Sequence, residues 1–246
     1  MKINSTVYQS VLNSKKKNRK LFSVLVDPDK FSPEAIREAA KAKVDFIFIG
    51  GSKVQKGNFY RCVNAIRKLS DIPLVIFPGS REQVSEKADA ILLLSLISGR
   101  NPDYLIGEHI KAARQLKASR LEIIPTGYIL IGGGKKISTQ AVTRTSPIKQ
   151  TDDGLAVSTA IAGELLGMKM IYLEAGSGAI NPLNISLVKN VRKNISAPII
   201  VGGGINTPEK AIALCKAGAD MIVVGNAIEK DVTIIHKSAK AIHNLK

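Results

Sequence analysis

The chain has 246 residues, of which 45% are hydrophobic and only 4% aromatic, so isoleucine, leucine, valine and alanine must fill a core large enough for one big domain or two small ones. Lysine and arginine outnumber aspartate and glutamate by 36 to 20, and the net charge of +16 favours anionic partners of any kind: polyanions, phosphorylated metabolites or membranes. The N-terminal MKINSTVYQSVLN has no apolar signal segment, and no apolar run reaches the roughly 18 residues that span a bilayer, which disfavours secreted and membrane-spanning classes and predicts a soluble, cytoplasmic protein.

Short β-branched segments alternate with longer amphipathic ones along the chain. We expect eight strands, over residues 21–27, 46–51, 74–79, 90–96, 122–131, 170–176, 199–204 and 221–228. Two of the intervening helices have clear starts: SPEAIREAAKA has Ser32 as N-cap before a proline, and TPEKAIALCKAGA begins in the same way at Thr207 and stops at Gly218. Strands and helices therefore alternate, as in α/β proteins.

Near-continuous apolar strands, each followed by a crossover, favour a parallel sheet covered on both faces. Eight such units in 246 residues match the size of a (β/α)8 TIM barrel, here one domain over residues 1–246, with a doubly wound open sheet as the alternative. Residues 132–158 are polar and weakly periodic, and we expect a long, mobile loop there. The basic run KKKNRK (15–20) is interpreted as a solvated helix end, with a membrane or nucleic-acid patch as the alternative.

In a TIM barrel the active site forms at the C-terminal ends of the strands, and phosphate commonly binds the loops after strands seven and eight. Those strand ends read VGGGIN (201–206) and VVGNAI (223–228). Glycines let backbone N–H groups approach phosphate oxygens, and the helix expected directly after Gly204 adds a favourable dipole. Two glycine clusters at consecutive strand ends favour a phosphate site over simple tight turns.

The first two predicted strands end in residues that suit a cation. Side-chain alternation places Asp27 at the barrel rim and points Ser52 the same way at the end of the next strand. A carboxylate and a hydroxyl suit Mg²⁺, which keeps several waters and takes few protein ligands besides substrate phosphates. The alternative for Asp27 is a turn residue before Pro28, and Asp29 is expected to face away and cap the turn.

The stretch YLEAGSG places a glutamate beside the predicted phosphate site. Alternation puts Tyr172 and Glu174 on one face of the strand. A carboxylate next to a phosphate is costly unless it has a partner or a task, and one task is to accept a proton from a substrate hydroxyl. The alternative is a structural ion pair with one of the many lysines.

Histidine and cysteine form no motif. His109, His236 and His243 lie in separate helical segments and are interpreted as surface or helix-end residues. Cys62 and Cys215 show neither a zinc spacing nor a disulfide framework, so we expect buried free thiols.

Five motifs together resemble one family. LVDPDK, FIGGS, YLEAGSG, IIVGGGI and VVGNAIEK, in order within residues 21–230, are similar to the geranylgeranylglyceryl phosphate synthases and their bacterial relatives, the heptaprenylglyceryl phosphate synthases. The resemblance implies a TIM-barrel prenyltransferase that joins the 3-hydroxyl of sn-glycerol 1-phosphate to an allylic prenyl diphosphate, with Mg²⁺. Some relatives carry a lysine two positions before the first aspartate; Leu25 stands there in this chain, which favours the geranylgeranyl type.

The resemblance also implies roles for individual residues. Asp27 and Ser52 would bind Mg²⁺. Glu174 would accept the proton of the attacking hydroxyl, and the Tyr172 ring would stabilise positive charge on the allylic carbon. The residues expected to line the glycerol phosphate site are Tyr172, Leu173, Glu174, Ala175, Gly176, Ser177, Gly178, Gly203, Gly204, Gly225 and Asn226.

Several partners and alternatives follow from the same resemblance. The prenyl tail needs an apolar groove near strands three to five, which Tyr104 would border unless it packs at a subunit interface. Relatives form dimers and larger rings, so a homo-oligomer, dimer or hexamer, is expected, and the basic surface suits transient contact with anionic membranes. The competing interpretations are a phosphosugar isomerase or epimerase on the same barrel and a non-catalytic nucleic-acid scaffold. Aromatics are too scarce to favour the scaffold, so we expect no nucleic-acid partner.

Overall fold

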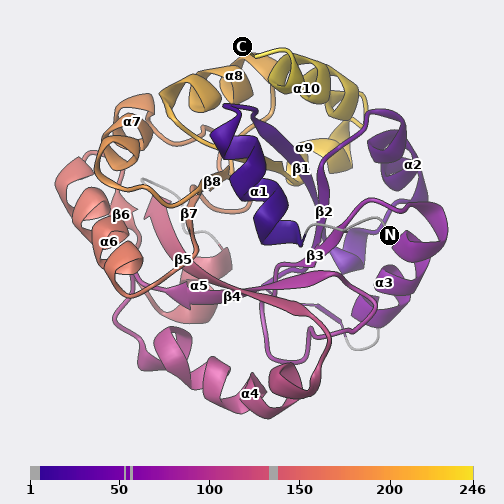
Figure 1. Cartoon of the computed structure of the whole chain (residues 1–246), viewed down its shortest axis with the longest axis horizontal. Helices are drawn as coiled ribbons and strands as arrows, with labels where there is room; N and C mark the ends of the chain where they lie inside the picture. The colour runs from indigo at the N-terminus through magenta and orange to yellow at the C-terminus, as the bar shows by residue number, and fades with distance from the viewer. Residues whose placement is uncertain (1–5, 53, 56–57, 133–137, 246) are drawn as a thin grey trace.

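The computed structural model describes residues 6–52, 54–55, 58–132 and 138–245. Within them, eight parallel strands close into a barrel in the order β1, β2, β3, β4, β5, β7, β8, β9, with β9 pairing back to β1 (Figure 1). The strands are β1 Leu21–Val26, β2 Phe46–Ile49, β3 Leu74–Ile76, β4 Ala90–Leu96, β5 Glu122–Gly132, β7 Met170–Glu174, β8 Ile199–Gly202 and β9 Met221–Val224. The predicted TIM barrel is confirmed, and the closed ring excludes the open sheet.

Helices surround the barrel in Figure 1. They are α2 Pro33–Lys41, α3 Asn58–Leu69, α4 Glu108–Ala118, α5 Ser138–Thr143, α6 Asp153–Leu165, α7 Ile185–Asn194, α8 Pro208–Ala217, α9 Asn226–Lys230 and α10 Ile234–His243, with a 3-10 turn at Pro28–Lys30 and a π-helical turn, η2, at Asp103–Gly107. The predicted caps form: Ser32 accepts from the Ala35 N–H, Thr207 accepts from the Lys210 N–H, and Gly218 ends α8 with φ 118°. Residues 77–89, all described, connect β3 to β4 through turns without a helix.

Apolar side chains form two layers, one inside the barrel and one between strands and helices. Along β7, Met170 and Tyr172 belong to the interior layer, whereas Ile171 and Leu173 pack against the helices. This alternation confirms the predicted faces of the strand. The two cysteines, Cys62 in α3 and Cys215 in α8, are buried and free, as expected.

Helix α1, Val7–Lys16, closes the N-terminal end of the barrel. Val7 and Val11 pack on the interior layer, and the Tyr8 N–H donates to the Glu122 carboxylate at the start of β5, 3.2 Å away. In Figure 1 the helix lies across the middle of the ring. Access to the interior is therefore left to the opposite end, where the strands terminate.

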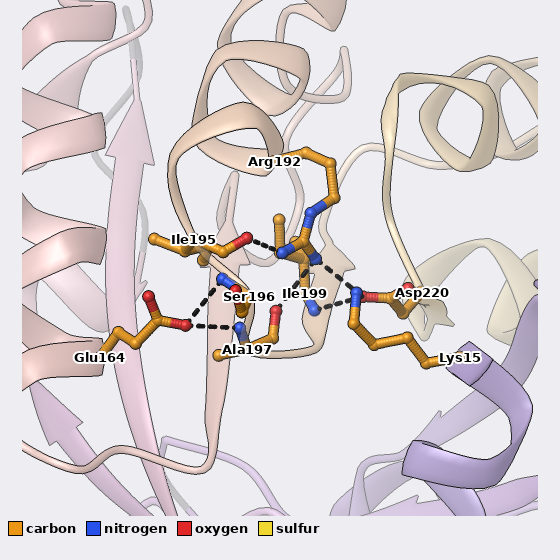
Figure 2. A network of polar contacts seen from close by, with 8 residues as sticks. All are labelled: Lys15, Glu164, Arg192, Ile195, Ser196, Ala197, Ile199 and Asp220. Carbon is orange, nitrogen blue, oxygen red and sulfur yellow. Dashed lines mark hydrogen bonds and ion pairs between the residues drawn. The ribbon is translucent and has the colours of Figure 1, made fainter.

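A polar network ties the same N-terminal end together (Figure 2). The buried Asp220 carboxylate accepts from the Ile199 N–H at 2.9 Å and from Arg192 Nη1 at 3.1 Å, and Lys15 Nζ lies 3.5 Å away. Gly218 lets the arginine pass, because a Cβ there would lie 2.3 Å from Arg192 Cγ. The basic run is thus the end of α1 with its connection to β1, as predicted, although Lys15 is half-buried rather than solvated.

The predicted long loop over residues 132–158 is wrong in the part that the structure describes; residues 133–137 lie outside it. A short helix, α5, is followed by the strand β6, Ile148–Lys149, which pairs with the end of β5. Helix α6 already begins at residue 153, because Asp152 caps it by accepting from the Leu155 N–H at 3.0 Å. Polar composition concealed both the cap and the buried Ile148.

Candidate active site

A cavity of about 840 Å³ opens at the C-terminal ends of the barrel strands. Its polar end is bordered by Asp27, Ser52, Glu174, Gly176, Ser177, Gly178, Gly203, Gly204, Gly225 and Asn226. Its other end continues toward α4, between apolar side chains of β4 and of the segment before it. The structure thus brings nearly all the predicted site residues to one space.

Glu174 is the buried acid of the polar end. Its carboxylate accepts a hydrogen bond from the Gly176 N–H at 2.6 Å and is only 6% exposed. Burial raises its pKa to about 7, although the Gly176 N–H and the neighbouring Tyr172 hydroxyl both act to lower that pKa. The predicted alternative, an ion pair with lysine, does not form among the described residues. A carboxyl with a pKa near neutrality is suited to proton transfer.

Tyr172 forms an aromatic cluster over the polar end of the cavity. Its ring centroid lies 5.1 Å from that of Phe77 and 5.4 Å from that of Tyr128. The hydroxyl lies close enough to Glu174 to affect the carboxylate, but it makes no hydrogen bond of ordinary geometry within the described structure. Tyr172 also borders the cavity.

The glycines after β8 allow the backbone to approach Glu174 closely. Gly203 and Gly204 adopt φ of +87° and +69°, which other residues rarely adopt. A Cβ at Gly203 would lie 2.6 Å from Glu174 Oε1, and one at Gly202 would lie 2.3 Å from Tyr172 Oη. Gly202 belongs to the VGGGIN cluster but was not among the predicted site residues, and the same packing requires a glycine there.

The loops after β7 and β9 meet across the cavity. Ser177 Oγ donates to Asn226 Oδ1 at 3.1 Å, and α9 begins at Asn226, directly after Gly225. Backbone N–H groups and a short helix at this position form the usual phosphate site of TIM barrels. Helix α8 begins at Pro208 with Thr207 as its N-cap, as TPEKA predicted, and residues 205–207 separate Gly204 from the helix.

Two predicted lining residues face the other way. The side chains of Leu173 and Ala175 are buried in the layer between strands and helices and do not border the cavity. Alternation explains this, because both lie one residue away from Tyr172 or Glu174 along the strand. Only their backbone groups are available to a ligand.

Asp27 and Ser52 border the same cavity on neighbouring strand ends. Asp27 also caps the 3-10 turn by accepting from the Asp29 N–H at 3.0 Å, so the cavity and turn interpretations both apply. Burial raises the Asp27 pKa, and the carboxylate has no ion pair among the described residues. Asp29 does not cap the turn as expected; it accepts from the Gln55 N–H and from Asn58 Nδ2 instead.

This donor set fits a cation that keeps most of its waters. A half-buried carboxylate without a charge partner and a nearby hydroxyl are compatible with Mg²⁺, which needs only one or two protein ligands when substrate phosphates complete its shell. No group of three or more histidine, cysteine, aspartate or glutamate side chains gathers into a metal site within the described residues.

The apolar end of the cavity is a groove beside α4. Its walls are Val84, Ile91, Leu93, Ala112 and Leu116. It exists because the connection from β3 to β4 has no helix to cover β4 at this point. The groove lies near the third to fifth strands, as expected.

Two residues from η2 and α4 also reach the cavity. Tyr104 borders it, as predicted, and donates to the Val142 carbonyl at 3.3 Å. His109 lies in the first turn of α4, as the helix-end interpretation expects, but it also borders the cavity, and its Nε2 lies 2.8 Å from the Leu94 carbonyl oxygen. Of the other two, His236 pairs with the partly exposed Glu38 carboxylate and His243 with the largely buried Asp45 carboxylate.

Comparison with known proteins identifies the family of this chain. The family model described as PcrB matches residues 8–245. The chain belongs to the PcrB family. Within the described residues no helix is long and apolar enough to cross a membrane.

Two proteins named geranylgeranylglyceryl phosphate synthase are similar to this chain over most of their length. The geranylgeranylglyceryl phosphate synthase of Chitinophaga pinensis is 51% identical over 245 residues, which cover 98% of this chain and 97% of that protein. The protein of the same name from Thermococcus kodakarensis is 41% identical over 227 residues, covering 90% and 89%. Both relatives therefore resemble this chain over 90% or more of its length.

Solved structures agree with the family assignment. The (S)-3-O-geranylgeranylglyceryl phosphate synthase of Thermoplasma acidophilum, in complex with its substrate sn-glycerol-1-phosphate, superposes with a TM-score of 0.92 at 34% identity and covers 98% of this chain and 100% of that one. A thiamine phosphate pyrophosphorylase from Pyrococcus furiosus, 17% identical with a TM-score of 0.59 and covering 93% and 97% of the two chains, shares the fold alone.

Proposed function

We propose that this chain is a prenyltransferase that forms the ether bond between the 3-hydroxyl of sn-glycerol 1-phosphate and geranylgeranyl diphosphate, releasing diphosphate. The observation that carries the proposal is one cavity with two unlike ends: glycine-rich loops beside a buried carboxyl, and an apolar groove. A small phosphate and a long hydrocarbon must meet in such an enzyme. Relatives that bear the synthase name share the whole chain.

The glycine-rich end suits glycerol phosphate. Backbone N–H groups around Gly203, Gly204 and Gly225, with the Ser177 hydroxyl, are placed to bind the phosphate oxygens. Glu174 then serves the hydroxyl end of the same molecule and accepts its proton as the oxygen attacks. Because its pKa is raised to about 7, the carboxylate is a stronger base than an exposed glutamate and is still half ionised near neutral pH.

The aromatic cluster suits the other reactant. Positive charge develops on the allylic carbon as the carbon–oxygen bond to diphosphate breaks. The Tyr172 ring, with Phe77 and Tyr128 beside it, offers a π-face to that charge, an interaction worth about 0.5–2 kcal/mol. The buried cluster also keeps water away from the cationic carbon.

Asp27 and Ser52 are the residues that would hold Mg²⁺. When bound, the ion acts as a Lewis acid that neutralises charge on the departing diphosphate. Lys30, on the same turn, is paired with Glu229 at 2.8 Å; its charge acts to lower the Asp27 pKa, but burial outweighs it, and among the described residues no lysine forms an ion pair with Asp27. Asp27 is thus left to bind a cation.

The decisive experiment combines purified protein with labelled glycerol 1-phosphate and geranylgeranyl diphosphate. An ether lipid should form with Mg²⁺ and not in its absence. Farnesyl and heptaprenyl diphosphates in parallel reactions measure the preferred tail length. Absence of product with every prenyl diphosphate from ten to thirty-five carbons would contradict the proposal.

Two further properties belong to the proposal. The net charge of +16 suits transient binding to anionic membranes, where prenyl diphosphates reside, and flotation with phosphatidylglycerol vesicles should show binding that salt abolishes. We also expect a homo-oligomer, dimer or hexamer, which light scattering measures directly. The apolar groove disfavours a phosphosugar isomerase, whose substrate has no long hydrocarbon. The buried Glu174 carboxyl disfavours a nucleic-acid scaffold, which performs no proton transfer.

A further inference from the structure

The loops that follow β2 and β3 touch each other through their backbones. A Cβ on Gly79 would lie 2.0 Å from the Gly51 carbonyl oxygen, and one on Gly50 would lie 1.8 Å from the Phe77 carbonyl oxygen. No side chain fits between them, so the two loops form one unit. Any ligand bound by one loop is therefore sensitive to the position of the other.

The side chain of Gln83 holds the two loops together. Its Nε2 donates to the Gly51 carbonyl at 2.9 Å, and its Oε1 accepts from the N–H groups of Gly51 and Gly79, both at 3.3 Å. The side chain is 4% exposed. An amide is suited to this place because it donates and accepts at once and carries no charge into a buried site.

The need for such a fastening comes from the fold. Residues 77–89 contain no helix, so the loop after β3 lacks the support that helices give the other strand ends. Besides Gln83, Tyr60 in α3 contributes through its hydroxyl, which donates to the Glu82 carbonyl at 3.1 Å. Gln83 therefore helps to fix the position of this loop, which a covering helix does at other strand ends.

The unit lies on one side of the cavity. Gly51 immediately precedes Ser52, and a Cβ at Gly51 would lie 3.6 Å from Asp27 Oδ1. Beyond Gly79 come Ser80 and Arg81, which both border the cavity. The hydrogen bonds described for the Gln83 side chain all join Gly51 and Gly79, and none of them reaches the glycine loops after β7, β8 or β9.

We propose that Gln83 is a positioning residue for the diphosphate half of the site: it holds the ends of β2 and β3 at the separation at which Ser52, Ser80 and Arg81 receive the metal-bound diphosphate. This inference rests on the proposed function. It predicts that losing the amide weakens diphosphate binding and leaves glycerol phosphate binding unchanged. A merely structural role predicts instead that both ligands, or neither, are affected.

The main test replaces Gln83 by methionine, which has nearly the same shape and removes all three hydrogen bonds. The matched control is Gln9→Met, since the Gln9 side chain is exposed on α1 and donates to Asn13 within its own helix. In calorimetric titrations, Gln83→Met should weaken binding of inorganic pyrophosphate with Mg²⁺ roughly ten- to a hundredfold, as is usual when a supporting partner is lost. The dissociation constant of glycerol 1-phosphate should stay within about twofold.

Kinetics and hydrogen exchange supply two further measurements. Gln83→Met should raise KM for the prenyl diphosphate and not KM for glycerol 1-phosphate. In the free protein, exchange of the Gly51 and Gly79 amides should accelerate, while the control leaves it unchanged. Equal weakening of both substrates, or unchanged pyrophosphate binding with a folded variant, overturns the inference.

A second variant, Gln83→Glu, keeps the inference testable if Gln83→Met does not fold. Its carboxyl can donate to the Gly51 carbonyl only when protonated, so pyrophosphate binding relative to wild type should improve as the pH is lowered, whereas Gln83→Met shows no such recovery. If the ratio of the pyrophosphate dissociation constants of Gln83→Glu and wild type does not change with pH, the inference is contradicted. Failure of the wild-type protein to make any ether lipid would reject the proposed function instead, so the two failures are distinguishable.

Discussion

At the scale of single residues, Glu174 shows how burial converts an ordinary carboxyl into a base. Desolvation raises its pKa, and a donated backbone N–H limits the rise, so that the value comes to about 7. The glycines beside it make that environment possible because they leave no Cβ in its way. The carboxylate is therefore buried and still ionises near neutral pH.

We expect Glu174→Gln to lower kcat by about a hundredfold or more, since general base catalysis contributes on that order. Glutamine keeps the shape and can still accept from Gly176, so the dissociation constant of glycerol 1-phosphate should change little. Glu34→Gln, at an exposed position of α2, is the control. Equal turnover in both variants would remove Glu174 from the role of base.

The pH dependence has a definite sign. A base works only when deprotonated, and the pKa of Glu174 is raised to about 7, so kcat/KM should increase as the pH rises through about 7. An unperturbed glutamate would place that increase near pH 4.5. A profile measured from pH 5 to 9 decides between the two, and the residual activity of Glu174→Gln should lack this limb.

At the scale of elements, the strand ends combine unusual backbone angles with close approach. Gly203 needs both a positive φ and the absence of a Cβ, whereas Gly167, just after α6, has φ +84° and open space within 4 Å of the place that a Cβ would take. Comparing the two glycines therefore separates the effect of a positive φ, which both have, from the effect of crowding at Cβ, which only Gly203 has. Of the two, only Gly203 lies at the site.

Gly203→Ala should lose glycerol phosphate binding and destabilise the fold by more than Gly167→Ala, which bears only the left-handed strain of about 1–2 kcal/mol. The added methyl group must displace the Glu174 carboxylate or the Gly176 backbone. Thermal unfolding and calorimetric titration measure the two effects. Equal behaviour of both variants would show that crowding at Gly203 is unimportant.

Helix α4 forms one wall of the groove with one of its faces, which carries Ala112 and Leu116. Ala112 is buried at the groove, and its neighbour Ala113 is exposed on the outer face. Ala112→Trp should shorten the prenyl chain that the enzyme accepts, while Ala113→Trp should not. Mass spectrometry of products from mixed prenyl diphosphates measures this, and unchanged chain length in both variants would place the tail elsewhere.

At the scale of the whole molecule, the two ends of the barrel have different tasks. The C-terminal end contains the cavity, and the N-terminal end is closed by α1 and by the network around Asp220 (Figure 2). Arg192, Lys15 and the Ile199 N–H all depend on that one carboxylate. Stability and chemistry can therefore be perturbed separately.

Asp220→Ala should lower the free energy of unfolding by about 3–5 kcal/mol, because it leaves a largely buried arginine without its charge partner. For a domain of this size the melting temperature should fall by on the order of 10 °C. Below that temperature, kcat should match wild type. Asp71→Ala, at an exposed position, is the control, and a large loss of kcat at low temperature would contradict the separation of the two ends.

Local patterns predicted much of the architecture, because they involve residues near one another in the chain. The caps at Ser32 and Thr207 bond three residues ahead, and the alternation that put Tyr172 and Glu174 on the interior face spans two. The error over residues 132–158 arose where polar composition outweighed a local cap at Asp152. The strand-end glycines were recognisable as a cluster, but not the contact that requires each of them.

Strand number, the parallel barrel and the residue types at its mouth follow from local chemistry, since hydrophobic periodicity and turn preferences are properties of short segments. Closure of the barrel determined the contacts between distant segments. It brought Gln83 against Gly51, 32 residues away, made a groove where one helix is missing, and raised the pKa of Glu174. Hydrogen bonding between distant loops and desolvation depend on every atom packed around a group, so they arise only when the chain has folded.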